Sequence, residues 1–339
     1  MIRKYIFLVI IFFTTFTYSQ IGGRYTYQFL NLVSSPRQAA LGGKYVTGYN
    51  ADPTSAMLNP ASINAEMDNQ LAVNYVNYIG DVNYGSVSYA KALGKRERVI
   101  HAGVTYINYG NFNGFDEFGN ETADFSAGEV AISLGYAYTI PNSDFHIGAN
   151  GKFISSKLEE YTSIGGAVDL GFIYHNPDTK FDFGIAVRNL GTQFTTYAGT
   201  REDLPLSVDA GIAQTLNKVP IRWNFTLENL NVWNVAFRNP ARDLTDLEGN
   251  VEEDDPGFIN NALRHVVMGV EFFPEGGFNI RLGYNFRRSE ELRIEDQRSF
   301  AGLSGGISLK LGKFRFAYSY ARYNSAAASN TFGVNLNLQ

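Results

Sequence analysis

The sequence contains no cysteine among its 339 residues. This absence excludes disulfide bonds, thiolate metal sites, thiol catalysis and the lipid-bearing cysteine of a bacterial lipoprotein. A surplus of basic residues is also missing, because 28 Lys and Arg face 33 Asp and Glu, and a nucleic-acid partner is therefore not expected. Charged residues make up only 18% of the chain, whereas 26 Phe, 21 Tyr and 34 Gly are present. This composition is typical of a β protein with many turns.

Long apolar runs are missing beyond the N-terminus, which argues against a bundle of membrane helices of about 20 apolar residues each. The exception is a short apolar run at residues 5–13, which follows two basic residues. Small residues at Thr17 and Ser19 then fit a signal-peptidase site before Gln20. We expect residues 1–19 to be a cleaved signal peptide. An uncleaved anchor is the alternative, but an apolar run of about nine residues is too short to span the hydrocarbon.

From about residue 70 onward, apolar residues alternate with small or polar ones. Ile132 and Leu134 share one face, for example, and Ala131 and Ser133 share the other. Successive side chains of a strand point to opposite sides, so this period of two predicts strands with one apolar face. No stretch of this region has a convincing helical period. Fourteen segments follow the pattern: 70–79, 82–92, 99–109, 126–139, 144–156, 162–175, 181–190, 205–216, 221–233, 264–274, 277–287, 301–311, 313–323 and 331–338.

The lengths of these segments and of their connections predict a transmembrane barrel. Most segments reach the 9–11 residues that a tilted strand needs to cross a bilayer. The connections alternate between short turns and longer loops, as they do between the two sides of an outer-membrane barrel. A soluble sandwich or propeller gives no reason for this alternation. We therefore predict an all-β, fourteen-stranded antiparallel barrel over residues 70–339 in the outer membrane, with long loops extracellular and both termini periplasmic.

Residues 20–69 do not follow the strand pattern and are rich in small and turn-forming residues. A disordered tail is one interpretation, but apolar anchors at 39–41 and 56–58 favour a segment folded into the barrel as a hatch or plug. Asp52 and Asn59 each precede a proline, which biases them toward extended or turn geometry. Their side chains are expected to cap nearby backbone amides.

The hatch region also carries a resemblance to known barrels. The run from Asp52 to Ala61 resembles the Asn-Pro-Ala hatch signature of FadL-type fourteen-stranded barrels, through Asp52, Pro53, Asn59, Pro60 and Ala61. Residues 22–43 are similar to the N-terminal region of the PorQ family of the type IX secretion system of Bacteroidetes. The run 188–191 (Arg-Asn-Leu-Gly) also recurs in these barrels, and the PorV-type barrels are a close competitor.

The resemblance implies a structural partner that is not an enzyme and holds no cofactor. A PorQ-like barrel sits in outer-membrane lipid and holds a PorZ-like surface protein, in a complex with the sortase PorU and with PorV. That complex attaches exported cargo to anionic lipopolysaccharide. The alternatives are a FadL-like transporter of hydrophobic small molecules and a PorV-like shuttle that binds cargo. Small and polar residues on the predicted lumen faces weakly disfavour a lipid pocket.

Two catalytic patterns and the four histidines are interpreted as structural. The run 302–306 matches the nucleophile-elbow expression, but strand alternation continues after it where a helix is required. Ser88 and Lys91 match the Ser-x-x-Lys pattern of penicillin-binding enzymes, yet on a strand they point to opposite sides. The histidines lie in separate segments without metal-ligand spacing, and His175 is expected in a turn. No metal site is predicted, although two histidines meeting in the lumen are not excluded.

The connection 234–263 is the most unusual, because it is long and acidic. A calcium site is a minority interpretation, since the spacing does not match an EF-hand loop. A solvated acidic loop and a partner-binding loop are the main alternatives, and long exposed loops on a rigid scaffold are common sites of recognition. Aromatic anchors beside a charged rim fit an interface. The candidate partner-binding residues are Phe237, Asp243, Asp246, Glu248, Glu252, Glu253, Asp254, Asp255 and Phe258.

Overall fold

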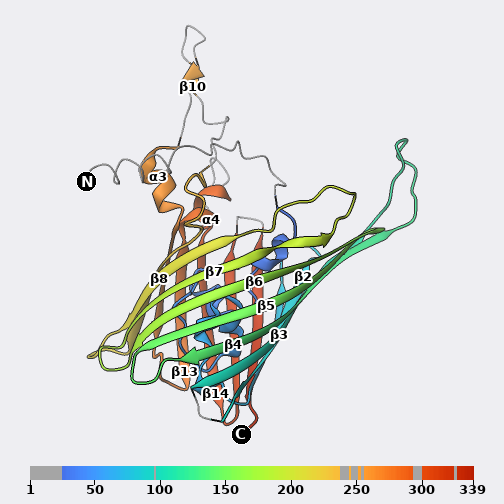
Figure 1. Ribbon diagram of the computed structural model, residues 1–339. Helices are drawn as coiled ribbons and strands as arrows, with labels where there is room; N and C mark the ends of the chain where they lie inside the picture. Colours follow the sequence, from blue (N-terminus) through green and yellow to red (C-terminus); the bar gives the residue numbers. More distant parts are fainter. Residues whose placement is uncertain are drawn as a thin grey trace, which may run out of the picture.

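Fourteen strands of the computed structural model close into one antiparallel barrel, as the sequence predicts (Figure 1). Each strand pairs with its neighbours along the chain, and the first strand, β1, pairs with the last, β16. Within the described part of the chain, no helix is both long and apolar enough to cross a bilayer. The structure describes residues 25–94, 97–236, 244–245, 251–252, 256–292, 300–323 and 327–339.

The barrel strands each overlap one predicted segment. They are β1 (Gln70–Asn77), β2 (Asn83–Ala92), β3 (Arg98–Phe112), β4 (Phe125–Thr139), β5 (Phe145–Leu158), β6 (Tyr161–Asn176), β7 (Phe181–Thr195), β8 (Ser207–Thr215), β9 (Ile221–Leu227), β12 (Val266–Phe272), β13 (Phe278–Asn285), β14 (Leu303–Leu311), β15 (Phe314–Arg322) and β16 (Ala328–Asn337). Strand β9 ends at Leu227, six residues before the predicted end, and β7 continues five residues beyond its predicted end. A separate hairpin pairs β10 (Leu244–Thr245) with β11 (Val251–Glu252).

Two short helices correct the expectation that this region has no helix. Strand β13 stops at Asn285, because the Asn285 side chain accepts a hydrogen bond from the backbone of Arg288 and begins α4 (Phe286–Glu291). A second helix, α3 (Phe258–Leu263), lies in the acidic connection. Both are about six residues long, too short for a helical period to emerge from the sequence.

The alternation along each strand sorts side chains into two environments. On β4, Ile132 and Leu134 are 47% and 67% exposed, whereas Ser133 between them is 5% exposed and faces the lumen. Exposed aromatic side chains stand near both ends of the wall, at Phe145, Phe278 and Phe314 on one side and at Tyr75, Tyr161 and Phe194 on the other. An apolar exterior band between two aromatic girdles is the surface of a barrel in a bilayer.

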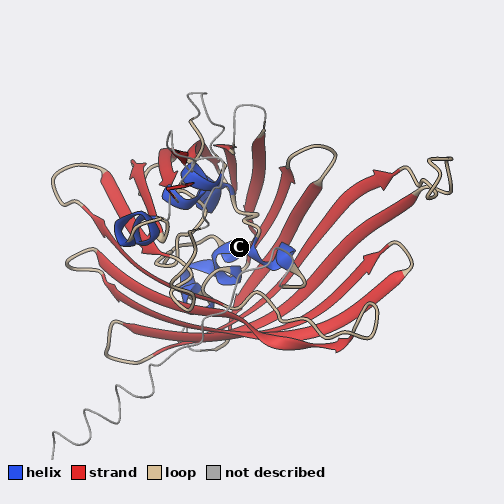
Figure 2. Cartoon of the chain, turned by 90° about the horizontal axis from the view of Figure 1, so that it is seen from above, coloured by secondary structure: helices blue, strands red, loops and turns tan. Residues whose placement is uncertain are grey.

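Residues 25–69 lie inside the barrel and are called here the lumenal segment (Figure 2). Glycine and proline break the segment into single turns, each too short to bury a face of its own. It contains η1 (Gln28–Asn31), α2 (Pro36–Ala40), η2 (Pro53–Met57), η3 (Pro60–Ser62) and η4 (Ala65–Met67). Its small side chains, among them Ala40, Val46, Ala56 and Ala61, are fully buried and form the core together with inward-facing side chains of the wall.

The lumenal segment runs between the two ends of the barrel. Tyr25 forms a β-bridge with Asp203, in the connection between β7 and β8, and therefore lies at the end that carries the long loops. The segment leaves the lumen at the other end, where short turns join the strands and where Gln339 bonds to Asp68 (Figure 1). The C-terminus thus lies at the short-turn end. The predicted signal peptide lies outside the described residues.

Candidate functional site

The two Asx-Pro steps of the predicted hatch motif each begin a short helix inside the lumen. The Asp52 side chain accepts a hydrogen bond from the backbone of Thr54 at 3.0 Å, and the Asn59 side chain accepts one from Ala61 at 3.0 Å. The Asn59 amide also donates to the Val46 carbonyl at 2.7 Å. Proline at the first position of each turn needs no amide donor. The predicted capping is therefore present and holds the segment in compact loops.

Glycines of the wall lie where the backbone of the lumenal segment touches it. A side chain at Gly148 of β5 would overlap with the carbonyl of Pro60, and one at Gly171 of β6 would overlap with Asn59. A side chain at Gly283 of β13 would overlap with the backbone at Gly42. The segment therefore packs directly on the strand backbone, without an intervening layer of side chains.

Ser304 shows that the elbow-like motif has a structural role. The chain continues as β14 from Leu303, with no helix after the serine. Ser304 Oγ donates to the carbonyl of Ala40 at 3.1 Å and accepts from the amide of Gly42 at 3.2 Å. The hydroxyl thus ties the wall to the lumenal segment.

The Ser-x-x-Lys pair is separated by the pleat of β2, as the sequence predicts. Ser88 is fully buried in the lumen. The Lys91 ammonium group instead lies 3.4 Å from a carboxylate oxygen of Asp68, at the short-turn end. The serine and the lysine therefore share no site.

A buried group of charges also joins the lumenal segment to the wall. Asp209 of β8 lies 2.8 Å from Arg188 of β7 and 3.8 Å from Lys44 of the segment, and all three are at least nine-tenths buried. Burial lowers the pKa of Lys44, the Arg188 charge lowers it further, and Asp209 opposes both effects. Arg188 opens the Arg-Asn-Leu-Gly run, and its next residue, Asn189, accepts from Lys152 at 2.9 Å. The first two residues of the run, Arg188 and Asn189, are therefore buried in the interior of the barrel, whereas Leu190 is exposed.

Two histidines meet at the short-turn end of the lumen, around Tyr49 of the lumenal segment. The Tyr49 ring stacks on His175 with centroids 4.2 Å apart and lies 4.5 Å from His146. His175 is not a turn residue, because β6 continues to Asn176 and places His175 2.5 Å from Asp182. Burial, followed by the Glu66 charge, raises the pKa of Tyr49 to about 12. Among the described residues, no three or more His, Asp or Glu are placed to hold a metal ion.

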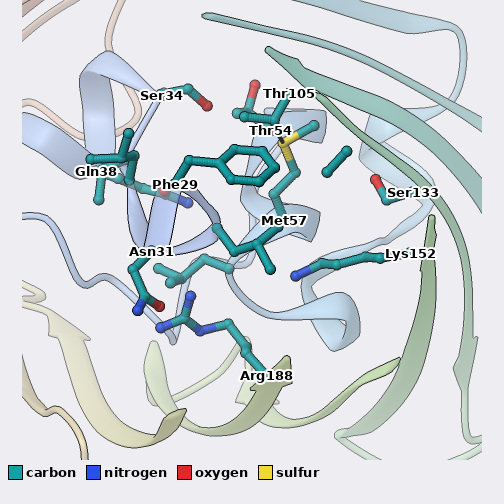
Figure 3. A pocket seen from close by; sticks show the side chains of 15 residues that line it. Phe29, Asn31, Ser34, Gln38, Thr54, Met57, Thr105, Ser133, Lys152 and Arg188 are labelled. Atoms are coloured by element: carbon teal, nitrogen blue, oxygen red, sulfur yellow. Dashed lines mark hydrogen bonds between the residues drawn. The ribbon is translucent and has the colours of Figure 1, made fainter. Parts of the chain in front are cut away.

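An enclosed pocket lies between the lumenal segment and the wall (Figure 3). Phe29 and Met57 bound it on one side, and Lys152 and Arg188 reach toward it from β5 and β7. Its volume is about 40 Å³, which is room for a few water molecules. A benzene-sized ligand needs about 150 Å³. The pocket is therefore too small for a hydrophobic solute while the segment is in place.

A larger cavity of about 530 Å³ opens at the short-turn end. Its walls are the lumenal segment, strands β12 to β16 and residues of β1, β8 and β9, and many of its lining residues are polar or charged. Glu271 of β12 pairs there with Arg37 of the segment and with Arg281 of β13, at 2.7 Å each. Burial by itself lowers the pKa of Arg37, but Glu271 more than reverses this effect, so that the pKa is raised.

Most of the candidate partner-binding residues lie outside the described part of the chain. These are Phe237, Asp243, Asp246, Glu248, Glu253, Asp254 and Asp255, and of Glu252 only the backbone, in β11, is described. Phe258 begins α3 and is 72% exposed, with its ring centroid 5.2 Å from that of Trp233. Ile259 and Leu263 of the same helix are also exposed. The long-loop end therefore carries an apolar patch formed by Trp233, Phe258, Ile259 and Leu263.

The closed, fourteen-stranded antiparallel barrel matches the fold of FadL-like barrels. It is similar to the toluene transporter TbuX of Ralstonia pickettii, with 13% identity and a TM-score of 0.55 over 92% of this chain and 100% of that one. It is also similar to a deltaS2 mutant of the monoaromatic hydrocarbon channel TodX, with 12% identity and a TM-score of 0.53 over 91% of this chain and 98% of that one. A FadL homologue of Pseudomonas aeruginosa is similar with 10% identity and a TM-score of 0.50, over 90% of this chain and 98% of that one.

At these identities the similarity shows the fold alone. No protein-family model and no curated protein sequence matches the chain. The similar structures are a transporter, a channel and a FadL homologue, which fits the expectation of a protein that is not an enzyme.

Proposed function

We propose that the protein is an outer-membrane barrel that transports small hydrophobic molecules, with the lumenal segment as its hatch. The observation that carries this proposal is the position of residues 25–69, which lie inside the lumen of a barrel similar to a toluene transporter and a monoaromatic hydrocarbon channel. In this proposal the short-turn end faces the periplasm and the long-loop end faces the outside, as in other outer-membrane barrels.

Transport requires the hatch to move. The enclosed pocket of about 40 Å³ leaves no room for an aromatic hydrocarbon, so a solute passes only when residues 25–69 shift. The contacts that hold the segment include hydrogen bonds from Ser304, Asn285 and Asn150 of the wall. A single neutral hydrogen bond contributes only about 0.5–1.5 kcal/mol, so the parts of the segment held by such bonds alone can shift in steps. Arg37 and Lys44 are held more firmly, by buried carboxylates of the wall.

A disulfide between hatch and wall tests this movement. Thr54 of η2 accepts a hydrogen bond from Asn74 of β1 at 2.9 Å, so the two positions are neighbours. Counting free thiols checks that cysteines placed there form the disulfide before uptake is measured. The chain has no other cysteine. We expect the oxidised Thr54→Cys, Asn74→Cys variant to lose at least tenfold in uptake of a monoaromatic hydrocarbon into proteoliposomes, and reduction to restore it.

A matched control places the disulfide within the wall. Asn74 also donates to Ser86 of β2 at 3.2 Å, and oxidised Asn74→Cys, Ser86→Cys should transport as the unmodified protein does. Equal uptake by both oxidised variants would show that the hatch does not gate the lumen. Absence of uptake by the unmodified protein would remove the transport proposal itself.

A second candidate function is the anchoring of a PorZ-like surface protein in the type IX secretion system, with PorU and PorV as further members of the complex. The apolar patch on α3 supports it, because exposed aromatic side chains at a loop fit the centre of an interface. The similarity of residues 22–43 to PorQ supports it as well. A PorV-like shuttle that binds cargo would use the same end of the barrel.

Shortening residues 240–258 to a tight turn separates the two candidates. The anchoring function predicts that the PorZ-like protein no longer co-purifies, while the barrel still inserts into the membrane. Full retention of that protein would place recognition elsewhere. A strain from which the whole protein is deleted gives a second comparison. Defective hydrocarbon uptake in that strain, with the PorZ-like protein still in its complex with PorU and PorV, would favour transport.

A further inference from the structure

In the cavity at the short-turn end, a single amide oxygen receives hydrogen bonds from three side chains. Asn279 Oδ1 accepts from Arg315 at 2.8 Å, from Arg281 at 3.2 Å and from the hydroxyl of Ser308 at 2.8 Å. A carbonyl oxygen has two lone pairs, so three donors exceed what this neutral oxygen can satisfy. One buried donor of the same cavity, Nε of Arg37, has no partner.

Positive charge is also in excess on this wall. Glu271 forms ion pairs with both Arg37 and Arg281. Within the described part of the chain, Arg315 forms no ion pair. Arg315 of β15 is the direct cross-strand neighbour of Lys310 of β14, and both line the cavity. Like charges directly opposite one another destabilise a sheet, and a bound anion would reduce this repulsion.

Three other carboxylates line the cavity, at Asp52, Glu66 and Glu275, and none is paired with its arginines. Glu66 is exposed to solvent. Asp52 accepts hydrogen bonds from Thr54 and Ser35 within the lumenal segment. Glu275 lies at the rim, where its side chain is 78% exposed and pairs with Lys180. The interior of the cavity therefore has guanidinium groups with unused donors and space beside them.

We propose that this cavity binds a small oxyanion, with a phosphate or carboxylate group held by Arg37, Arg281 and Arg315. Guanidinium groups bind both groups through paired N–H donors, and such charge-assisted bonds are stronger than neutral ones. A volume of about 530 Å³ accommodates a small molecule, and the opening admits it from the short-turn end. The site is separate from the enclosed pocket and does not depend on the transported solute.

Calorimetric titration of the detergent-purified protein with inorganic phosphate, at low ionic strength, tests the site. We expect Arg315→Gln to weaken binding at least tenfold. Asn335 of β16 is the cross-strand neighbour of Arg315 and lines the cavity, so Asn335→Asp adds a fixed carboxylate beside an intact arginine. This variant should also weaken binding at least tenfold, because the new carboxylate competes for the same donors.

The matched control is Arg287→Gln, which removes an arginine of α4 at the opposite end of the barrel, and phosphate should bind it unchanged. Acetate serves as the carboxylate probe in the same series, and binding of either anion that depends on Arg315 supports the site. Binding that Arg315→Gln leaves unchanged, or equal weakening in all three variants, would overturn it, as would absence of binding for both anions.

Thermal unfolding gives a readout that is independent of the titration. Phosphate should raise the unfolding temperature of the unmodified protein and of Arg287→Gln, because a ligand that binds only the folded state stabilises it. It should not raise that of Arg315→Gln. If phosphate stabilises all variants alike, the effect is a general one of the salt and the site is not present.

Discussion

At the scale of single residues, the interior differs from that of a soluble protein in its number of buried charges. Asp209 compensates Arg188 and Lys44 at a position without solvent. We predict that Asp209→Ala lowers the free energy of unfolding by about 3–5 kcal/mol, because two buried cations lose their counter-charge. The temperature at which the folded band disappears in semi-native gel electrophoresis measures this loss.

An exposed ion pair provides the comparison for Asp209. Glu291 pairs with Arg287 at 2.7 Å on α4, and both side chains are about 30% exposed. Glu291→Ala should change the free energy of unfolding by less than about 1 kcal/mol. A comparable effect of both substitutions would mean that the Asp209 group is not desolvated as described.

Two glycines on β5 test the close approach of the lumenal segment. A methyl group at Gly148 would overlap with the backbone of Pro60, whereas one at Gly151 meets no atom within 4 Å. We predict that Gly148→Ala destabilises the protein by about 1–3 kcal/mol, as overpacking does. Gly151→Ala should have little effect in the same gel assay. Equal stability of the two variants would indicate that the segment is not packed against β5.

At the scale of elements, the strands could be predicted because the bilayer demands apolar side chains on one face only. Ile132, Ser133 and Leu134 illustrate this, since their alternation in the sequence is their alternation between lipid and lumen. The contact between His146 and His175 could not be located from the same pattern. Alternation assigns both to the lumen, but their meeting depends on the register between β5 and β6 and on Tyr49, which comes from the lumenal segment.

The lumenal segment is the element whose removal should have the largest effect. We predict that deletion of residues 39–61 gives a barrel that is leaky to small antibiotics or is poorly expressed. The deletion removes Lys44 and the segment's contacts with Ser304 and Gly148, and it leaves the buried polar groups of the wall facing an open lumen. Antibiotic susceptibility and ion conductance in planar bilayers measure the leak. Unchanged permeability together with unchanged expression would contradict a plug.

At the scale of the whole molecule, the exterior predicts how the protein behaves in a membrane. Exposed aliphatic side chains between aromatic ends should keep it in the membrane fraction during a carbonate wash. The closed sheet should also migrate faster on a gel before boiling than after it. Extraction by carbonate, or migration that boiling does not change, would contradict a membrane barrel.

The ion pairs of the lumen could not be predicted from the sequence alone. Arg37, Glu271 and Arg281 belong to the lumenal segment, β12 and β13, and only the closed barrel brings them together. Lys310 and Arg315, by contrast, flank the tight turn between β14 and β15. Strand alternation around that turn is enough to place them opposite one another.

The pairing of β1 with β16 has a consequence for the order of folding. Val73 pairs with Val334, so the barrel cannot close before almost the entire chain has been made. Contacts between such distant residues form slowly. Until they form, both edge strands present unpaired amides and carbonyls to other chains, which is a hazard for aggregation. We therefore expect the closing of the seam between β1 and β16 to be the late step of folding, and the one at which a chaperone is most useful.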